Sequence, residues 1–189
     1  MNLAFTQAAY WDLESRSQPF YDTSFKPALI VRWEELGNGG WNWVRRLHLE
    51  GGYEHHSNGR EIPASRSMET LYFKPTFIWR LFGMSDFVFE PKMWVVFDQS
   101  ALNENITDYW GNFNLQLTWR ADFGLQIRTH TIPAPERTNF NAQFTYPLNR
   151  LWRPLNFYVM ADYWEGSGEV FLDYEIPGHG WLFGIALSR

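Results

Sequence analysis

Residues 41–57 read Trp-Asn-Trp-Val-Arg-Arg-Leu-His-Leu-Glu-Gly-Gly-Tyr-Glu-His-His-Ser. The odd positions of this stretch are mostly apolar, whereas the even positions are mostly polar or charged. Because successive side chains of a β-strand point to opposite faces, a period of two indicates a strand with one apolar and one charged face. The stretch is therefore predicted to be a strand that separates an apolar environment from a polar one.

The same alternation recurs along the chain. A first strand is predicted around Phe5, and others over residues 25–33, 70–80, 87–97, 109–119, 123–127, 140–146, 155–161 and 181–187. The apolar positions are odd-numbered throughout, except in 140–146, where they are even-numbered. With 41–57, this pattern predicts ten strands.

The polar faces of these strands carry Arg, Glu, Lys, Asp and His, strand after strand. Such faces suit a hydrated lumen whose outer wall turns apolar residues toward lipid. The aromatic content of 19% points the same way, because aromatic rings favour the membrane interface. We predict an all-β fold, an antiparallel transmembrane β-barrel. A soluble lipid-binding barrel is the alternative, since its strands would alternate as well.

Composition narrows the possible classes further. The 189 residues contain no linker or shift of composition, which predicts one domain over residues 1–189. The absence of cysteine excludes disulfides, zinc thiolates and a thiol nucleophile. Acids and bases are mixed along a chain of net charge -5, so no basic patch indicates nucleic acid. No apolar run approaches the roughly 18 residues of a transmembrane helix, and strand-like sequence follows Met1 where a signal peptide would stand.

The connections fall into two alternating sets. The short ones are predicted at 37–40, 83–85 and 121–122, and the longer ones at 13–22, 58–66, 99–106 and 165–180. Bacterial outer-membrane barrels have short periplasmic turns and longer outer loops. The pattern thus predicts the bacterial outer membrane, with both termini on the periplasmic side and segment 58–66 on the cell-surface side.

Two polar residues with catalytic potential lie on the predicted lipid-facing side. His55 and Ser57 are two apart in one strand, so they share a face. Symmetric pairing around the connection 58–66 places Glu69 opposite His55 and Ser67 opposite Ser57, with Cβ atoms about 4.5 to 5.5 Å apart. A serine, a histidine and a carboxylate in this order suit acyl transfer, because imidazole takes the serine proton and the carboxylate orients imidazole.

The chain resembles the outer membrane phospholipase A family. The resemblance rests on a histidine and a serine two apart, then Asn-Gly-Arg, then Ser-Arg-Ser. These are His55, Ser57, 58–60 and 65–67. It continues through segments 5–7, 17–20, 105–109, 166–169 and 173–174, and so covers almost the whole chain.

The resemblance implies a calcium-dependent hydrolase that acts as a homodimer on membrane phospholipids and lysophospholipids. It makes Ser57 the nucleophile and His55 the general base. It also implies that Ca²⁺ is held by the Arg60 carbonyl and the Ser65 hydroxyl of one subunit and the Ser17 hydroxyl of the other. The ion would polarise a water that stabilises the oxyanion together with the Gly59 amide.

Two features depart from the family pattern. Glu69 stands where the best-known members have asparagine as the third triad residue. The resemblance also begins part-way into the pattern of a twelve-stranded barrel and lacks roughly its first two strands. Either this barrel closes with ten strands or the sequence is part of a longer one.

Other functional alternatives follow from the same residues. A catalytically silent barrel, acting as a pore or a structural protein, would also have a polar lumen. The neighbouring His55 and His56 face opposite sides of a strand, which argues against a shared zinc site. His48 and His130 are interpreted as lumen residues and His179 as a loop residue. Arg45 is a charge on the apolar face, explained either by snorkelling or by a dimer contact.

Overall fold

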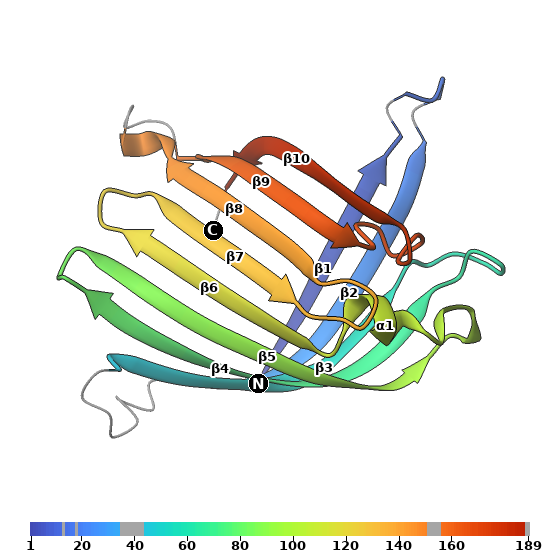
Figure 1. The fold of residues 1–189 in the computed structure, drawn as a ribbon, viewed down its shortest axis with the longest axis horizontal. Coiled ribbons are helices and arrows are strands. Elements are labelled where there is room, and N and C mark those ends of the chain that lie inside the picture. Colours follow the sequence, from blue (N-terminus) through green and yellow to red (C-terminus); the bar gives the residue numbers. More distant parts are fainter. Residues whose placement is uncertain (13, 18, 35–43, 151–155, 188–189) are drawn as a thin grey trace.

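A computed structural model describes residues 1–189 except 13, 18, 35–43, 151–155 and 188–189 (Figure 1). The strands are β1 (Asn2–Trp11), β2 (Phe20–Trp33), β3 (Arg46–Ser57), β4 (Ser67–Leu81), β5 (Ser85–Gln99), β6 (Phe113–Ala121), β7 (Gln126–Ile132), β8 (Asn139–Pro147), β9 (Tyr158–Ser167) and β10 (Pro177–Ala186). One short helix, α1 (Ile106–Trp110), and two 3₁₀ turns, η1 (Ala101–Asn103) and η2 (Leu148–Arg150), interrupt the connections.

The strands form one curved sheet in the order β1 to β10, each antiparallel to the next (Figure 1). The antiparallel ten-stranded fold predicted from the alternation is therefore confirmed. Within the described residues no ladder joins β10 to β1, so the sheet is not closed. The two ends meet at the rim, where the Tyr10 hydroxyl donates to the Glu169 carbonyl over 3.0 Å.

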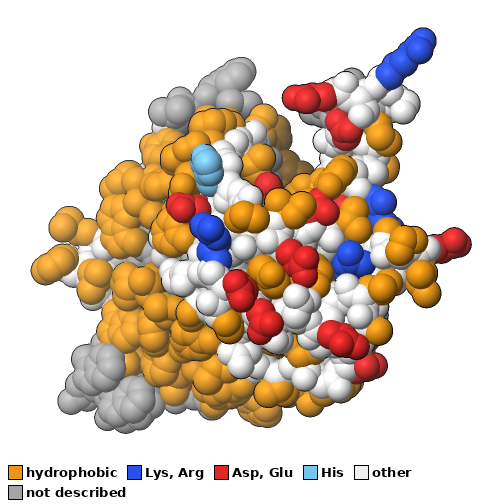
Figure 2. Space-filling model, turned by 45° about the vertical axis from the view of Figure 1, so that its right-hand side comes forward, with side chains coloured by type: hydrophobic (Ala, Val, Ile, Leu, Met, Phe, Trp, Pro, Cys, Tyr) orange, Lys and Arg blue, Asp and Glu red, His pale blue; other side chains and the backbone are white. Residues whose placement is uncertain are grey.

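Apolar side chains cover the outer wall of the sheet. Leu3 of β1, Val95 of β5 and Phe183 of β10 expose 85%, 61% and 78% of their surface. Figure 2 shows hydrophobic side chains over most of this wall and charged ones gathered over the end that carries α1. Even-numbered Phe140 of β8 is also exposed, which confirms the change of parity there. The outer wall thus has the character of a lipid-facing surface.

The inner wall is polar and internally paired. Glu50 is only 6% exposed, and its carboxylate oxygens lie 2.5 Å from Nη2 of Arg32 and 3.0 Å from Nζ of Lys74. Nζ of Lys92 lies 2.6 Å from Oε2 of Glu54. All of these residues are even-numbered and lie on β2 to β5, as the alternation predicts. Charges withdrawn from bulk water are stable when they are paired in this way.

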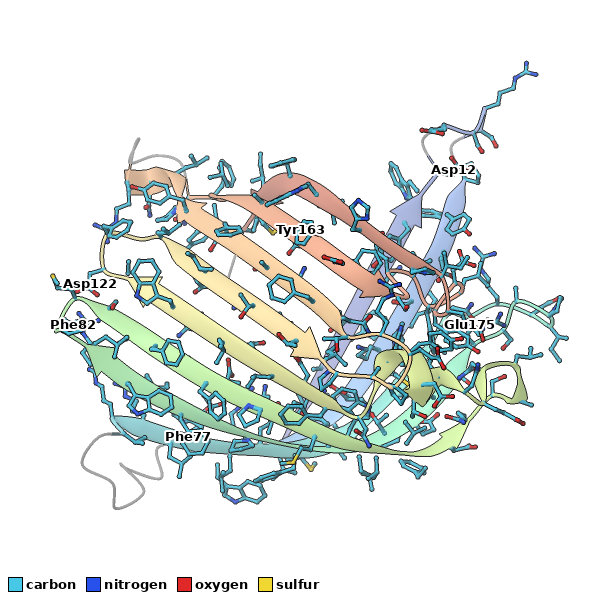
Figure 3. All side chains as sticks on the ribbon, viewed as in Figure 1. Asp12, Phe77, Phe82, Asp122, Tyr163 and Glu175 are labelled. Carbon is cyan, nitrogen blue, oxygen red and sulfur yellow. The ribbon has the colours of Figure 1, made fainter. Side chains whose placement is uncertain are left out.

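The prediction of one short-turn rim is confirmed only in part, because the long connections 34–45 and 148–157 lie at the same end as the short turns β4–β5 and β6–β7. Short turns carrying Phe82 and Asp122 lie at one end, and α1 lies at the other, beside Glu175 (Figure 3). At the second end Ile106, Phe171 and Tyr174 form a small buried apolar cluster between α1 and the connection 168–176. The longer connections are therefore packed against each other.

The prediction of a strand from 109 onward is wrong at its start. Tyr109 and Trp110 belong to α1, and β6 begins at Phe113. The helix ends at Gly111, which has φ of 59° and could not carry a Cβ, since that atom would lie 2.3 Å from the Pro133 carbonyl oxygen. A backbone turn that requires glycine thus separates helix from strand.

Three other expectations for single residues can be compared with the structure. His179 lies in β10, paired with Glu165, and not in a loop, because the β9–β10 ladder extends through two glycines that give no alternation signal. Nη1 of Arg45 lies 3.5 Å from Oδ1 of Asp86, so its charge has an acidic partner within the chain. Nδ1 of His130 lies 3.2 Å from Nδ2 of Asn114 on the inner wall.

Some predictions lie outside the described residues. The expected short turn at 37–40 and the beginning of the strand at 41–43 belong to them. Among the described residues, no helix has the length and apolar character needed to cross a membrane.

Candidate active site

Ser57 and His55 lie at the end of β3 next to the rim that carries α1. In the β3–β4 ladder Ser57 pairs with Ser67, and His55 pairs with Glu69. This register is the one that symmetric pairing around 58–66 predicts. The serine, the histidine and the carboxylate consequently share one face of two neighbouring strands.

The Glu69 carboxylate is held at both oxygens. Its Oε1 contacts Nδ1 of His55, and its Oε2 accepts a hydrogen bond from the Tyr53 hydroxyl. The side chains of His55 and Glu69 are 32% and 20% exposed, so the pair is partly shielded. Engagement of Nδ1 leaves Nε2 as the ring nitrogen that can accept a proton.

Sequence analysis did not identify Tyr53 and Asp98 as neighbours of this site. Tyr53 could have been found, because it shares the parity of His55 and lies one diagonal step from Glu69. Asp98 could not, because a register shift in the β4–β5 ladder pairs Glu69 with Asp98 but Thr70 with Val96. Such a bulge leaves no reliable mark in an alternating sequence.

Asn58 organises the loop that follows Ser57. Its side chain, in a residue only 2% exposed, accepts from the Arg66 amide at 2.9 Å and donates to the Ala64 carbonyl at 2.8 Å. Its backbone amide also donates to the Arg66 carbonyl at 3.1 Å. These bonds close the loop 58–66 into a fixed shape.

Gly59 is required at its position in this loop. It has φ of 66°, and a Cβ there would lie 2.9 Å from a ring carbon of Phe25. A side chain would therefore be strained and would collide with β2. Gly59 is exposed and lies two residues beyond Ser57.

Arg60 anchors the same loop to the rest of the rim. Its guanidinium donates to the Tyr21 carbonyl and lies 3.4 Å from Oδ1 of Asp22, a fully buried carboxylate. The other oxygen of Asp22 accepts from the Leu172 amide at 2.9 Å. One buried charge thus connects β2, the loop 58–66 and the connection 168–176.

The predicted calcium ligands are only partly brought together. Arg60 and Ser65 lie in one braced loop, whereas exposed Ser17 lies in the connection between β1 and β2, with no described hydrogen bond to that loop. No cluster of three or more His, Asp or Glu side chains suited to a metal occurs in the described part of the chain. The predicted donors are hydroxyl and carbonyl oxygens, a type that Ca²⁺ accepts.

His56 lies on the opposite face from His55. Its ring stacks on Phe171 at a centroid distance of 4.1 Å and on Trp110 at 5.4 Å. The two adjacent histidines therefore point to opposite sides of β3, as the strand period predicts. His56 is a packing residue of the rim.

Comparison with known proteins supplies an independent observation. The family model described as phospholipase A1 matches residues 1–187. The phospholipase A1 of Proteus vulgaris is 30% identical over 185 residues, covering 93% of this chain and 57% of the relative. This chain thus spans somewhat more than half the length of that relative.

Solved structures show the same architecture. An outer membrane phospholipase A from Escherichia coli, described as an active-site mutant with an asparagine replaced by alanine, superposes with a TM-score of 0.83 at 25% identity. That match covers 98% of this chain and 69% of the other. The calcium-bound dimer of the Salmonella typhi enzyme matches with a TM-score of 0.83 at 23% identity, over 98% of this chain and 69% of the other.

Proposed function

The chain belongs to the phospholipase A1 family of outer-membrane β-barrels, and we propose that it hydrolyses acyl esters of phospholipids and lysophospholipids with Ser57, His55 and Glu69. The observation that carries the proposal is the contact of His55 Nδ1 with Glu69 on the apolar outer wall, two residues from Ser57. Polar side chains are costly on a lipid-facing wall, and catalysis gives them a reason to be there.

The geometry supports a two-step acyl transfer. Nε2 of His55 takes the proton of Ser57 as the hydroxyl oxygen bonds to the ester carbonyl, and Glu69 stabilises the imidazolium. The proton then passes to the departing alcohol of the lysophospholipid. Water, deprotonated by the same imidazole, releases the fatty acid and restores Ser57.

The oxyanion is the point at which the loop 58–66 contributes. The negative charge that develops on the ester oxygen needs donors placed in advance. The Gly59 amide is our proposed donor, because this residue is exposed and held in a left-handed conformation by the bonds of Asn58. A rigid loop avoids the cost of ordering during the reaction.

The residues of this loop also fit a calcium ion. Asn58 holds the segment that contains Arg60 and Ser65, and the Arg60 side chain is tied back to Asp22, so its carbonyl is carried on fixed backbone. We propose that the Arg60 carbonyl, the Ser65 hydroxyl and the partner subunit's Ser17 hold Ca²⁺ in a homodimer. When bound, the ion supplies positive charge beside the developing oxyanion.

A homodimer explains why Ser17 lies apart from the other two proposed ligands in a single chain. It also gives a role to Gln7, an exposed amide opposite Phe25 on the outer wall. An amide in lipid is stabilised when a second subunit satisfies it. We place the active site at the cell-surface side, because α1 and the connection 168–176 pack together at that rim.

Release of fatty acid from phospholipid micelles tests the proposal. Ser57→Ala should lose at least roughly a thousandfold in kcat. Ser24→Ala is the matched control, because Ser24 lies on the inner parity of β2 and should leave the activity unchanged. Removal of calcium by a chelator should abolish activity, and added calcium should restore it.

Labelling with a sulfonyl fluoride adds a chemical readout. The modified residue should be Ser57, and the label should form only with calcium present. Hydrolysis that continues at the wild-type rate in Ser57→Ala, or labelling of another serine, would contradict the proposed mechanism.

A further inference from the structure

The third member of the proposed triad, Glu69, is a carboxylate in this chain. It carries a charge that an asparagine at the same position would not carry. Glu69 lies on the outer wall and is only 20% exposed, so its charge is poorly hydrated. Asp98 of β5 is its cross-strand partner in the ladder. A carboxylate held partly out of water is stabilised by hydrogen bonds to its oxygens.

Tyr53 supplies such a bond. Its hydroxyl donates to Oε2 of Glu69, the oxygen that His55 does not use. The Tyr53 ring also contacts that of Phe97, with centroids 6.2 Å apart, and Phe97 is the residue at the register shift between β4 and β5. With one donor on each oxygen, the carboxylate has a single preferred orientation toward the imidazole.

We propose that Tyr53 is a positioning residue of the triad, which holds the Glu69 carboxylate in the orientation that aims it at His55. The inference rests on the proposed hydrolase function. An asparagine in the same position would be neutral and would present one oxygen instead of two, so Tyr53 would matter less to it. The role of Tyr53 is therefore tied to the carboxylate at position 69.

The test is a double-mutant cycle of kcat and KM in phospholipid micelles. Tyr53→Phe removes one hydroxyl and keeps the ring, and it should lower kcat about tenfold or more while KM stays within about twofold. In a Glu69→Asn background the same change should alter kcat by less than about twofold. Such non-additivity is not expected of a purely structural tyrosine.

Tyr163→Phe is the matched control. The Tyr163 hydroxyl donates to Glu165 at 2.9 Å on the outer wall of β9, so it has the same chemistry far along the sheet from β3. It should leave kcat unchanged. Tyr53→Leu serves as a second variant, since leucine suits a lipid-facing strand position, and folding of each variant is checked by circular dichroism.

The outcomes separate this inference from the proposed function. An active wild type with an equally active Tyr53→Phe overturns the inference and leaves the proposed function standing. A loss of the same size in the wild-type and the Glu69→Asn backgrounds also overturns it, because the hydroxyl would then act independently of the carboxylate. A wild type that releases no fatty acid with calcium present overturns both.

Discussion

At the scale of single residues, two adjacent histidines have opposite surroundings. His55 binds Glu69 on the outer wall, and His56 stacks on Phe171 and Trp110 inside the rim. We expect His55→Asn to lower kcat roughly a thousandfold, because the general base is lost. His56→Phe should keep most of the activity, since phenylalanine preserves both stacking contacts.

Initial rates of fatty-acid release, normalised to folded protein, measure this difference. His179→Asn, in β10, controls for loss of a histidine at an unrelated place. Equal losses in the His55 and His56 variants would contradict the assignment of His55 as the only base of the pair.

The contacts of single residues at the site were only partly predictable from the sequence. The pairing of His55 with Glu69 was predictable, because period-two alternation and a symmetric hairpin fix which residues oppose each other. The contact of Tyr53 with the same carboxylate was also predictable, because Tyr53 is the diagonal neighbour of Glu69 on the same face of the β3–β4 pair. Asp98 was not predictable, since its place depends on a register shift that the alternation does not encode.

At the scale of elements, the loop 58–66 depends on the buried side chain of Asn58. Asn58→Ala removes two strong hydrogen bonds, to Arg66 and Ala64, and should lower the free energy of unfolding by about 2 kcal/mol. Activity should fall more than tenfold, because Gly59 and Arg60 would lose their fixed positions.

Asn139→Ala is the matched control for this loop. Asn139 is also buried, donates to the Tyr109 carbonyl at 2.7 Å and accepts from the Ser167 amide at 2.6 Å, outside the proposed site. Urea unfolding should show a similar loss of stability, but the folded variant should keep its kcat. A folded Asn58→Ala with wild-type kcat would show that the loop does not need this brace.

The buried carboxylate of Asp22 joins β2 to the loop 58–66 and to the connection 168–176. Asp22→Ala leaves the Leu172 amide without its acceptor and removes the charge that faces Arg60, whereas Asp22→Asn still offers one oxygen. We therefore expect Asp22→Ala to be more destabilising than Asp22→Asn by about 1 kcal/mol. Arg60 is partly exposed, so solvent screening weakens its share of the interaction.

Urea unfolding of the two Asp22 variants, each with and without Arg60→Gln, measures the coupling. A coupling free energy of about 1 kcal/mol is expected between Asp22→Asn and Arg60→Gln. Additive effects within about 0.3 kcal/mol would mean that the ion pair does not join the two elements.

Sequence patterns predicted elements unevenly, and the reason is physical. Strands that face lipid on one side must alternate apolar and polar residues, so the alternation in the sequence was enough to predict them. The helix α1 has only five residues, Ile106–Trp110, too few to show a helical period. Its packing against Phe171, far along the sequence, is a tertiary contact that no local pattern reports.

At the scale of the whole molecule, the inner wall decides whether the protein conducts ions. Arg32, Glu50 and Lys74 form an ion-pair cluster on β2 to β4, and the Tyr72 hydroxyl donates to Glu50 at 2.9 Å. Nζ of Lys92 lies 4.1 Å from the centre of the Tyr72 ring. Side chains that bind one another across neighbouring strands occupy the space that a pore would need.

We therefore expect little ion current from the protein reconstituted in a planar bilayer, even when it hydrolyses lipid. Replacing Glu50, Tyr72 and Lys92 together by serine removes both ion pairs of the cluster and the side chains that pack on them, and should raise the conductance severalfold. The Ser57→Ala variant should stay as silent as the wild type, because its change lies on the outer wall. A large steady conductance in the wild type would favour a pore, and the ion-paired lumen would then need a second, open arrangement.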